Sequence, residues 1–503
     1  MTVARRAATA LVALCLAPML LLVPGTGDGT ASGPAQHQPR PGRSAPNPVA
    51  PSLLSHAGSI PSVAAPTPQA TAGRAASTVR GSWSSALVEL PVAGGSAELE
   101  GRVRSLLQRR EAAIRAQDRA AWLAAVGPTS PRGMPGAARQ GIADQQAAVF
   151  DRIVQLPLTL FRYDSARLLP PRATGRGSGP AASTGSTGST GSSGSTAAGR
   201  VVEVRGTYAL GRFGGPRTFR ERFVLGRPVG GAGGPALLPL PDGSRSPRVS
   251  VPWDLPGMRV VRGRSSLVVG NAALSRLRGY ARLADRAVQL VDRQWGTDWS
   301  RAPVLIVPAT AEEYAGLTGQ TTSAATTSQV AAVTTGPLDA DGRASADQVV
   351  VRSATWSELT AQGRAAVVTH EVTHVATRAS TTAPVPLWLS EGLADYLAYR
   401  AVALPPEAIA ADLLDRVRSG VGPIGVPPDS AFGAGVRDLA ASYQAAWLLC
   451  RHIATTHGEA ALLRLYRTVA AGTPVRRAVP EMLGVDEDQL TAAWLTDLHR
   501  LSH

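Results

Sequence analysis

The sequence contains no lysine, so all 51 of its basic residues are arginine. It is also poor in cysteine, with 2 residues, and in aromatic side chains, which occupy 5% of 503 positions. Cys15 lies in an apolar N-terminal run, and removal of that run would leave Cys450 without a disulfide partner, so we expect a fold held by its core alone. Few aromatic side chains and no run of five or more cations argue against binding of nucleic acid.

The net charge of +15 is unevenly distributed along the chain. Residues 1–260 hold 29 arginines and 13 acidic residues (29 − 13 = +16), whereas residues 261–503 hold 22 and 23 (22 − 23 = −1). A scattered basic surface attracts anionic polymers through its summed field. We therefore expect weak contact between the N-terminal half and an anionic cell envelope.

The N-terminus has the features of an export signal. Arg5 and Arg6 precede an apolar run of 17 residues from Ala7 to Val23. That length is at the upper limit for a cleaved signal and at the lower limit for a membrane span. Residues 1–32 are therefore predicted to be a signal peptide or a membrane anchor, and both alternatives stay open. Either one predicts an extracytoplasmic protein, secreted or held at the membrane.

Composition then divides the rest of the chain into a linker and two folded parts. Residues 33–79 are rich in proline and alanine and have too little apolar periodicity to fold, so we predict a disordered linker. Residues 80–270 are predicted to be an accessory α+β domain, with a flexible Gly/Ser/Thr loop at 183–199. A helix is expected at 97–126, and four strands are expected at 150–163, 200–211, 217–226 and 257–269. This order of elements resembles the small cone-shaped domains of the NTF2-like superfamily; the alternative is an α+β domain with no activity of its own.

The second folded part, residues 271–503, begins with a different pattern. A long helix is expected at 272–294, followed by a buried strand at 302–309 and apolar runs at 330–333 and 348–353. A helix over 357–377 should then carry the motif described next. We predict a small sheet with a mostly helical C-terminal part.

The stretch "THEVTH" at 369–374 brackets a glutamate with two histidines. On a helix, residues four apart share a face, so His370 and His374 can direct both imidazoles at one metal ion. Glu371 lies about 100° further around the helix, which prevents it from joining them as a ligand but allows it to act as a general base. The alternative is an ordinary helix with two histidines. The apolar residues around the motif make that alternative costly, because buried histidines without a partner are unfavourable.

A second segment, "PVPLWLSEGLADYLAYR" at 384–400, places Glu391 17 positions after His374, with Asp395 one turn further on. The combined pattern H-E-x-x-H…E-x-x-x-D resembles the gluzincins, the zinc peptidase group that includes thermolysin and the zinc aminopeptidases. The resemblance implies His370, His374 and Glu391 as ligands of one zinc ion, Glu371 as the catalytic base, and Asp395 as the acceptor that orients a ligand histidine. It covers about residues 270–500.

The departures from this family limit what can be carried over. The gap before Glu391 is slightly shorter than in thermolysin or the aminopeptidases, and the Gly-x-Met-Glu-Asn strand of the aminopeptidases is absent. "WLSEGLADYLA" is more similar to the bacterial peptidase-MA-like proteins.

Further along, Tyr443 and the residues after it resemble the aminopeptidase segment whose tyrosine stabilises the oxyanion; the alternative is a core aromatic residue. Cys450 is expected to be a small buried thiol, and His452 is expected on the surface.

These features together predict an exported zinc metallopeptidase that acts on peptide or protein substrates. Two alternatives belong to other classes. The first is a catalytically silent zincin-fold binding or scaffold protein at the cell envelope. The second is a basic envelope-binding module, formed by residues 80–265, to which the zincin part is secondary.

Overall fold

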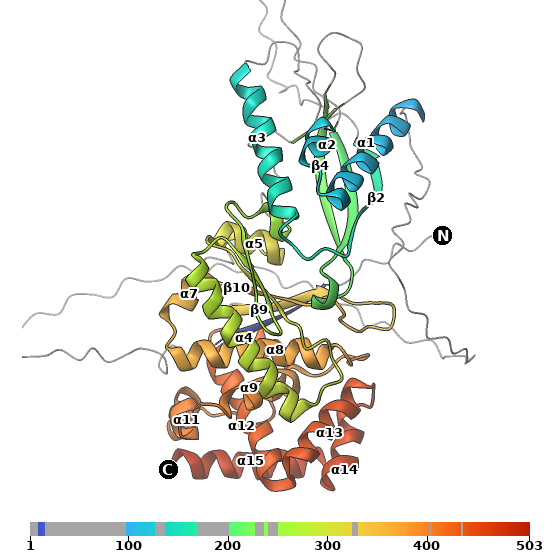
Figure 1. The fold of residues 1–503 in the computed structure, drawn as a ribbon. Coiled ribbons are helices and arrows are strands. Elements are labelled where there is room, and N and C mark those ends of the chain that lie inside the picture. The colour runs from blue at the N-terminus through green and yellow to red at the C-terminus, as the bar shows by residue number, and fades with distance from the viewer. Residues whose placement is uncertain are drawn as a thin grey trace, which may run out of the picture. The chain divides into compact units, whose positions relative to one another are not determined.

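The computed structural model describes residues 9–15, 97–125, 136–169, 201–226, 236–239, 250–323, 330–402, 404–433 and 436–503 (Figure 1). Helices and two separate sheets make up these residues, which confirms the predicted α+β class. Both sheets belong to one compact unit of the chain. The predicted linker at 33–79 and the predicted loop at 183–199 lie outside the described residues.

The first sheet is antiparallel and has four strands in the order β2-β3-β4-β5. Its strands are β2 (Leu160–Leu168), β3 (Val201–Ala209), β4 (Arg217–Gly226) and β5 (Ala236–Pro239). The helices that precede it are α1 (Ala97–Ala116), α2 (Arg119–Ala124) and α3 (Gly136–Ile153), and the short turns η2 (Gly211–Phe213) and η3 (Pro252–Asp254) follow β3 and β5. Aromatic residues fill the core between helices and sheet, with Phe219 stacked on Phe161 and Trp253 against Tyr208.

The structure corrects the elements expected here in three places. The strand expected at 150–163 begins only at Leu160, because the residues up to Ile153 belong to α3, a helix that was not expected. The predicted helix at 97–126 is broken after α1, where Gln117 adopts a positive φ of 53° and Asp118 caps α2. The segment 257–269 was predicted as the fourth strand of this sheet, and that prediction was wrong: it forms β6 (Arg259–Arg262) and β7 (Leu267–Gly270) of the second sheet, while β5 is the fourth strand. Alternation of apolar residues identifies a strand, but it does not say which sheet the strand joins.

The second sheet has six strands in the order β1-β9-β10-β8-β7-β6. Beside β6 and β7, its strands are β1 (Thr9–Cys15), β8 (Val304–Val307), β9 (Val330–Pro337) and β10 (Gln348–Val351). Strands β7, β8 and β10 run parallel and are buried along their whole length, as expected for strands covered on both faces. The other pairs are antiparallel.

Strand β1 comes from the apolar run that we predicted as an export signal or anchor. It pairs antiparallel with β9, from Thr9 opposite Pro337 to Cys15 opposite Val330. The rest of residues 1–32 lies outside the described part of the chain. Among the described residues, none of the helices is both long and apolar enough to cross a membrane.

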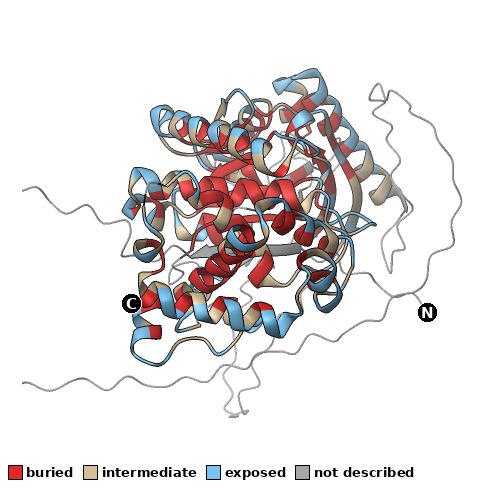
Figure 2. Ribbon diagram, turned by 90° about the horizontal axis from the view of Figure 1, so that it is seen from below, coloured by how far each residue is buried: buried red, intermediate tan, exposed pale blue. Residues whose placement is uncertain are grey.

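Helices make up the rest of the second part. They are α4 (Leu274–Trp295), α5 (Ala311–Thr318), α7 (Ser353–Glu358), α8 (Ala361–Arg378), α9 (Leu387–Tyr399), α10 (Pro406–Ile409), α11 (Ala411–Arg418), η4 (Asp429–Phe432), α12 (Leu439–His457), α13 (Glu459–Ala470), α14 (Val475–Leu483) and α15 (Glu487–Ser502). Helix α8 packs against α4, α9 and strand β9, and α12 packs on α9. Figure 2 shows buried residues gathered in the middle of the molecule, whereas the helices at its outside expose one side.

Candidate metal centre

Helix α8 holds the motif in the interior of the molecule. Thr360 caps the helix by accepting a hydrogen bond from the backbone N–H of Gly363. Every residue from Ala366 to Thr377 is buried, with His370 0% and His374 1% exposed. A helix that is apolar on most of its sides belongs in a core, so the histidines are carried inside with it.

Helix α9 brings the second half of the pattern to the same place. It begins after Pro386, and its residues Glu391 and Asp395 are 1% and 2% exposed. Gly392 lets α9 approach α12 closely, because a Cβ atom there would lie 2.4 Å from the carbonyl oxygen of Ala446. The glycine thus sets how deep the neighbouring Glu391 lies.

Three side-chain atoms from α8 and α9 converge on one point. His370 Nε2 and His374 Nε2 lie 2.9 Å apart, and Glu391 Oε2 lies 3.3 Å from the first and 3.4 Å from the second. Glu391 Oε2 is buried and makes no hydrogen bond of acceptable geometry. A buried carboxylate oxygen that approaches two imidazole nitrogens without bonding either is arranged as a ligand would be, and this cluster could hold a metal ion.

Charge and burial act against each other in this cluster. Burial alone would lower the pKa of His370, but the carboxylates of Asp395 and Glu391 outweigh it and raise the pKa to about 10. Burial also opposes ionisation of Glu391, yet the two histidines hold its pKa down at about 2. For His374 burial prevails and lowers the pKa. The protein therefore keeps Glu391 as a carboxylate, the form that binds a cation.

Asp395 lies behind the cluster, as the pattern implied. Its Oδ1 is 2.7 Å from His370 Nδ1, and both side chains are buried. A carboxylate there accepts the Nδ1 proton, so Nε2 is the nitrogen that faces the point of convergence and that can bind a metal ion once its own proton is displaced.

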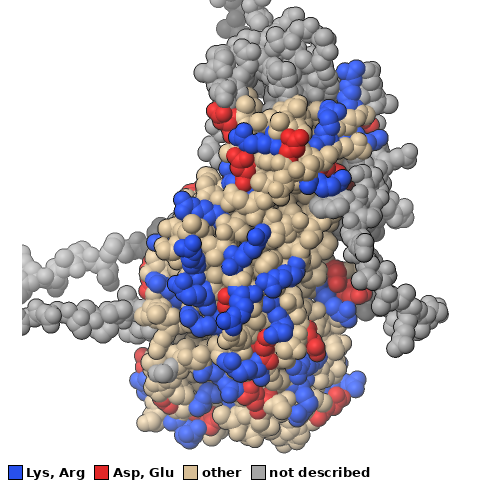
Figure 3. Space-filling model, in the orientation of Figure 1, with Lys and Arg blue, Asp and Glu red and all other residues tan. Residues whose placement is uncertain are grey.

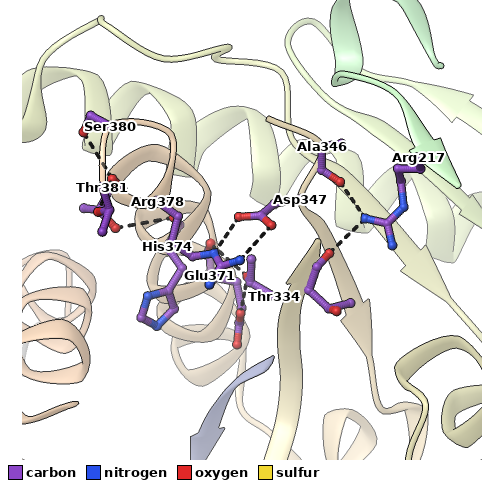
Figure 4. A network of polar contacts seen from close by, with 11 residues as sticks. Arg217, Thr334, Ala346, Asp347, Glu371, His374, Arg378, Ser380 and Thr381 are labelled. Carbon is purple, nitrogen blue, oxygen red and sulfur yellow. Dashed lines mark hydrogen bonds and ion pairs between the residues drawn. The ribbon is translucent and has the colours of Figure 1, made fainter. Parts of the chain in front are cut away.

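Glu371, the predicted base, has two differently placed carboxylate oxygens. Oε2 accepts a hydrogen bond of 2.5 Å from the hydroxyl of Thr334 on β9, while Oε1 is buried and has no partner (Figure 4). Burial raises the pKa of Glu371 to about 7, although the charge of His370 and the bond from Thr334 oppose the rise. A carboxylate whose pKa is close to neutral pH can both accept and release a proton.

Three other residues predicted from the sequence lie on α12. Tyr443 is buried with its ring edge-on to Phe432 at 5.3 Å, and its role as an oxyanion donor stays a prediction. Cys450 is fully buried and unreactive, since burial raises the pKa of its thiol. The prediction that His452 lies on the surface was wrong: it is buried, with Nδ1 2.5 Å from Asp497 Oδ2 on α15.

The sequence did not point to the residues that fix β9 against α8. Thr334 is one, and the ion pair of Asp347 with Arg378, at 2.8 and 3.2 Å, is another (Figure 4). A polar residue inside the otherwise buried strand "VAAVTT" was the available signal for Thr334, because such a residue needs an internal partner.

Comparison with known proteins assigns neither a family nor a function to this cluster of residues. No protein-family model matches the chain, and a search of curated proteins finds no match.

Proposed function

We propose that this protein is a zinc metallopeptidase of gluzincin type. The observation that carries the proposal is the convergence of His370 Nε2, His374 Nε2 and Glu391 Oε2. Ligand atoms at 2.0–2.1 Å from a tetrahedral zinc ion lie about 3.3–3.4 Å from one another. The separations of Glu391 Oε2 from the two histidines, 3.3 and 3.4 Å, fit that spacing, and the third, 2.9 Å, is slightly short.

The remaining residues of the site fit peptide hydrolysis. Zinc bound by these three residues would supply Lewis-acid polarisation of the scissile carbonyl and a water of lowered pKa. Glu371 would accept a proton at Oε1 and deliver it to the leaving amine, because that oxygen has no other partner. Asp395 would keep His370 in the tautomer that leaves Nε2 free.

The edge of β9 supports a peptide as the substrate. β9 carries Thr334 beside Glu371, and on its outer side it pairs with the extended segment β1. β1 occupies this edge in the structure, so a peptide substrate would take the place of β1 and use the same row of backbone donors and acceptors. Export from the cytoplasm and an NTF2-like form for the first part remain proposals that rest on the sequence.

Two variants test the metal and the base separately. Purified protein should hold about one zinc ion per chain by plasma mass spectrometry, and His374→Ala should lose it, whereas the control His457→Ala should not. Glu371→Gln should keep the zinc ion and the fold but lose a factor of roughly 10²–10⁴ in hydrolysis of a peptide library, because an amide does not accept the proton. Glu358→Gln, an exposed glutamate on α7, is the matched control.

Each outcome decides between classes of function. Zinc binding without hydrolysis of casein or of any library peptide would refute the peptidase and favour an inert scaffold. Stoichiometric zinc in His374→Ala would refute the ligand assignment.

A further inference from the structure

Strand β9 contacts the base through a single buried hydroxyl. Thr334 is 0% exposed, and its Oγ1 lies 2.5 Å from Glu371 Oε2 and 3.2 Å from the carbonyl oxygen of Glu371. A hydroxyl has one proton to donate, and the shorter contact is to the carboxylate. This bond fixes Oε2 and leaves Oε1 as the oxygen available to accept a proton.

The strand itself is held by an arginine from the other sheet. Arg217, the first residue of β4, donates from Nη1 to the carbonyl oxygens of Thr335, at 3.1 Å, and Ala346, at 2.6 Å (Figure 4). Thr335 is the residue next to Thr334, and Ala346 lies just before β10. The backbone N–H of Gly215 also donates to the carbonyl of Ser345, at 2.6 Å. The hairpin of β9 and β10 is therefore bound from the first part of the chain.

A second contact binds this hairpin to helix α8, which carries His370 and His374. Asp347 lies over Gly336 of β9, where a Cβ atom would come within 2.2 Å of its Oδ1, and it pairs with Arg378 in the last turn of α8. The Asp347 side chain is 1% exposed, so the pair is shielded from water. The hairpin is thus fastened to α8 at Arg378 and to β4 at Arg217, and the contacts on β9 are made at the two residues that follow Thr334.

We propose that Thr334 is the positioning residue of the base Glu371, and that Arg217 holds Thr334 in place from the accessory part of the chain. This gives the first sheet a role in the chemistry of the second, and it rests on the proposed function. A charge-assisted bond from Thr334 keeps the carboxylate in one orientation, so the proton acceptor does not have to be reoriented in each turnover. Arg217 acts through the backbone of β9 and touches neither substrate nor metal.

The role of the Thr334 hydroxyl is tested by a substitution that keeps the shape of the side chain. Thr334→Val should lower kcat roughly 10–100-fold, the factor expected from loss of a hydrogen bond to a charged group, with KM within about twofold and zinc content unchanged. Thr334→Ser should restore most of kcat, which a packing role would not predict. A kcat for Thr334→Val within threefold of wild type would overturn the proposal.

The role of Arg217 is tested by a double-mutant cycle. Arg217→Met should lower kcat by about 3–10-fold in the wild-type background and much less in Thr334→Val, because both act through one bond. Arg220→Met, an exposed arginine on the same strand, should leave kcat unchanged in both backgrounds. Independent, multiplying effects of Arg217→Met and Thr334→Val would separate the two residues and overturn the link.

Binding of acetohydroxamic acid to the zinc-loaded protein gives a readout that does not need turnover. Its N–OH proton must pass to a base beside the metal when it binds as the anion, so Glu371→Gln should weaken its Kd. Thr334→Val should weaken the Kd at least about threefold, and Thr334→Ser should not. If wild type binds the hydroxamate but cleaves no peptide, the proposed function fails while this comparison still decides the role of Thr334. Equal affinities of wild type and Thr334→Val would refute it.

Discussion

Glu221, on β4 of the first part, lies outside the metal cluster; the residue is half-buried, and its carboxylate oxygen Oε2 is buried. Burial raises its pKa to about 7, and Asp254 adds to the rise, while the charge of Arg110 opposes it. Its Oε2 makes no hydrogen bond. A carboxylate in this position is more easily kept protonated than ionised.

This carboxylate should make stability depend on pH. Its folded pKa of about 7 exceeds the ordinary value of 4.5, so between these pH values the folded chain holds a proton that the unfolded chain has lost. The contribution of Glu221 to the free energy of unfolding therefore falls as pH rises through this window, by at most about 3 kcal/mol. Glu221→Gln should remove that part of the fall, as measured by denaturant unfolding of the whole chain at pH 5 and pH 8.

The control for this measurement is Glu203→Gln on the neighbouring strand, where the carboxylate is paired with Arg222 at 2.7 Å. It should leave the difference between the two pH values unchanged. The same fall in wild type and in Glu221→Gln would show that Glu221 is ionised throughout.

The residues of the cluster could be predicted from the sequence, whereas the residues around it could not. Helix geometry predicted that His370 and His374 share a face, and the resemblance of the combined pattern to the gluzincins implied Glu391 and Asp395 on a second helix. Thr334 meets Glu371 only through the pairing and tilt of a strand 37 residues away. No periodicity in one sequence encodes that contact, because it depends on tertiary packing.

At the scale of elements, the crossing of α9 and α12 decides the depth of the site. The two helices approach at Gly392, where a Cβ atom would lie 2.4 Å from Ala446 O and 2.7 Å from Cys450 Sγ. A side chain at this position would therefore force the two helices to shift apart. Glu391, the adjacent residue, would move with α9.

Gly392→Ala should therefore destabilise the protein by about 1–3 kcal/mol and weaken zinc binding, as measured by thermal unfolding and by competition with a chelator dye. Gly279→Ala in α4 is the matched control, since the nearest atom to its Cβ would be Arg282 Nη2 at 3.9 Å. That control should gain about 0.5–1 kcal/mol, as expected when alanine replaces glycine inside a helix. Equal stability of the two variants would mean that α9 and α12 can separate at no cost.

The elements themselves were predicted where a pattern was long. The expected helices at 272–294 and 357–377 correspond to α4 and α8. The sequence did not predict which of the two sheets a short strand joins, as β6 and β7 demonstrate. A strand of four residues is compatible with either sheet until the partners are known.

At the scale of the whole molecule, positive charge is not limited to the N-terminal half. Arg278, Arg282, Arg286 and Arg293 are exposed along one side of α4, whose rotation of about 100° per residue brings them together. The acidic residues of α4 do not pair with these arginines. Asp285 accepts hydrogen bonds from the backbone N–H groups of residues 264–266, and Asp292 pairs with Arg301. Figure 3 shows the arginine side chains spread over this face of the molecule. Positive charge is therefore exposed on the second part of the chain as well, although residues 261–503 carry a net charge of −1.

The metal centre should also contribute to the stability of the whole molecule. Its proposed ligands come from α8 and α9, and these helices pack on α4, on α12 and on strand β9. An ion bound to the folded chain and not to the unfolded chain adds RT ln(1 + [L]/Kd) to the free energy of unfolding, about 2.7 kcal/mol at a hundredfold excess over Kd. Chelation should remove this term and lower Tm, and added zinc should restore it.

His374→Ala separates this effect from nonspecific action of zinc. In calorimetry, its Tm should be the same with chelator and with excess zinc, whereas wild type and His457→Ala should both shift upward with zinc. Glu371→Gln should shift like wild type, because Glu371 supplies no ligand atom in the cluster. A zinc-dependent rise of Tm in His374→Ala as large as in wild type would place the ion elsewhere. Absence of a rise in wild type would mean that α8 and α9 are held by packing alone, and that their buried histidines and carboxylates are satisfied by each other.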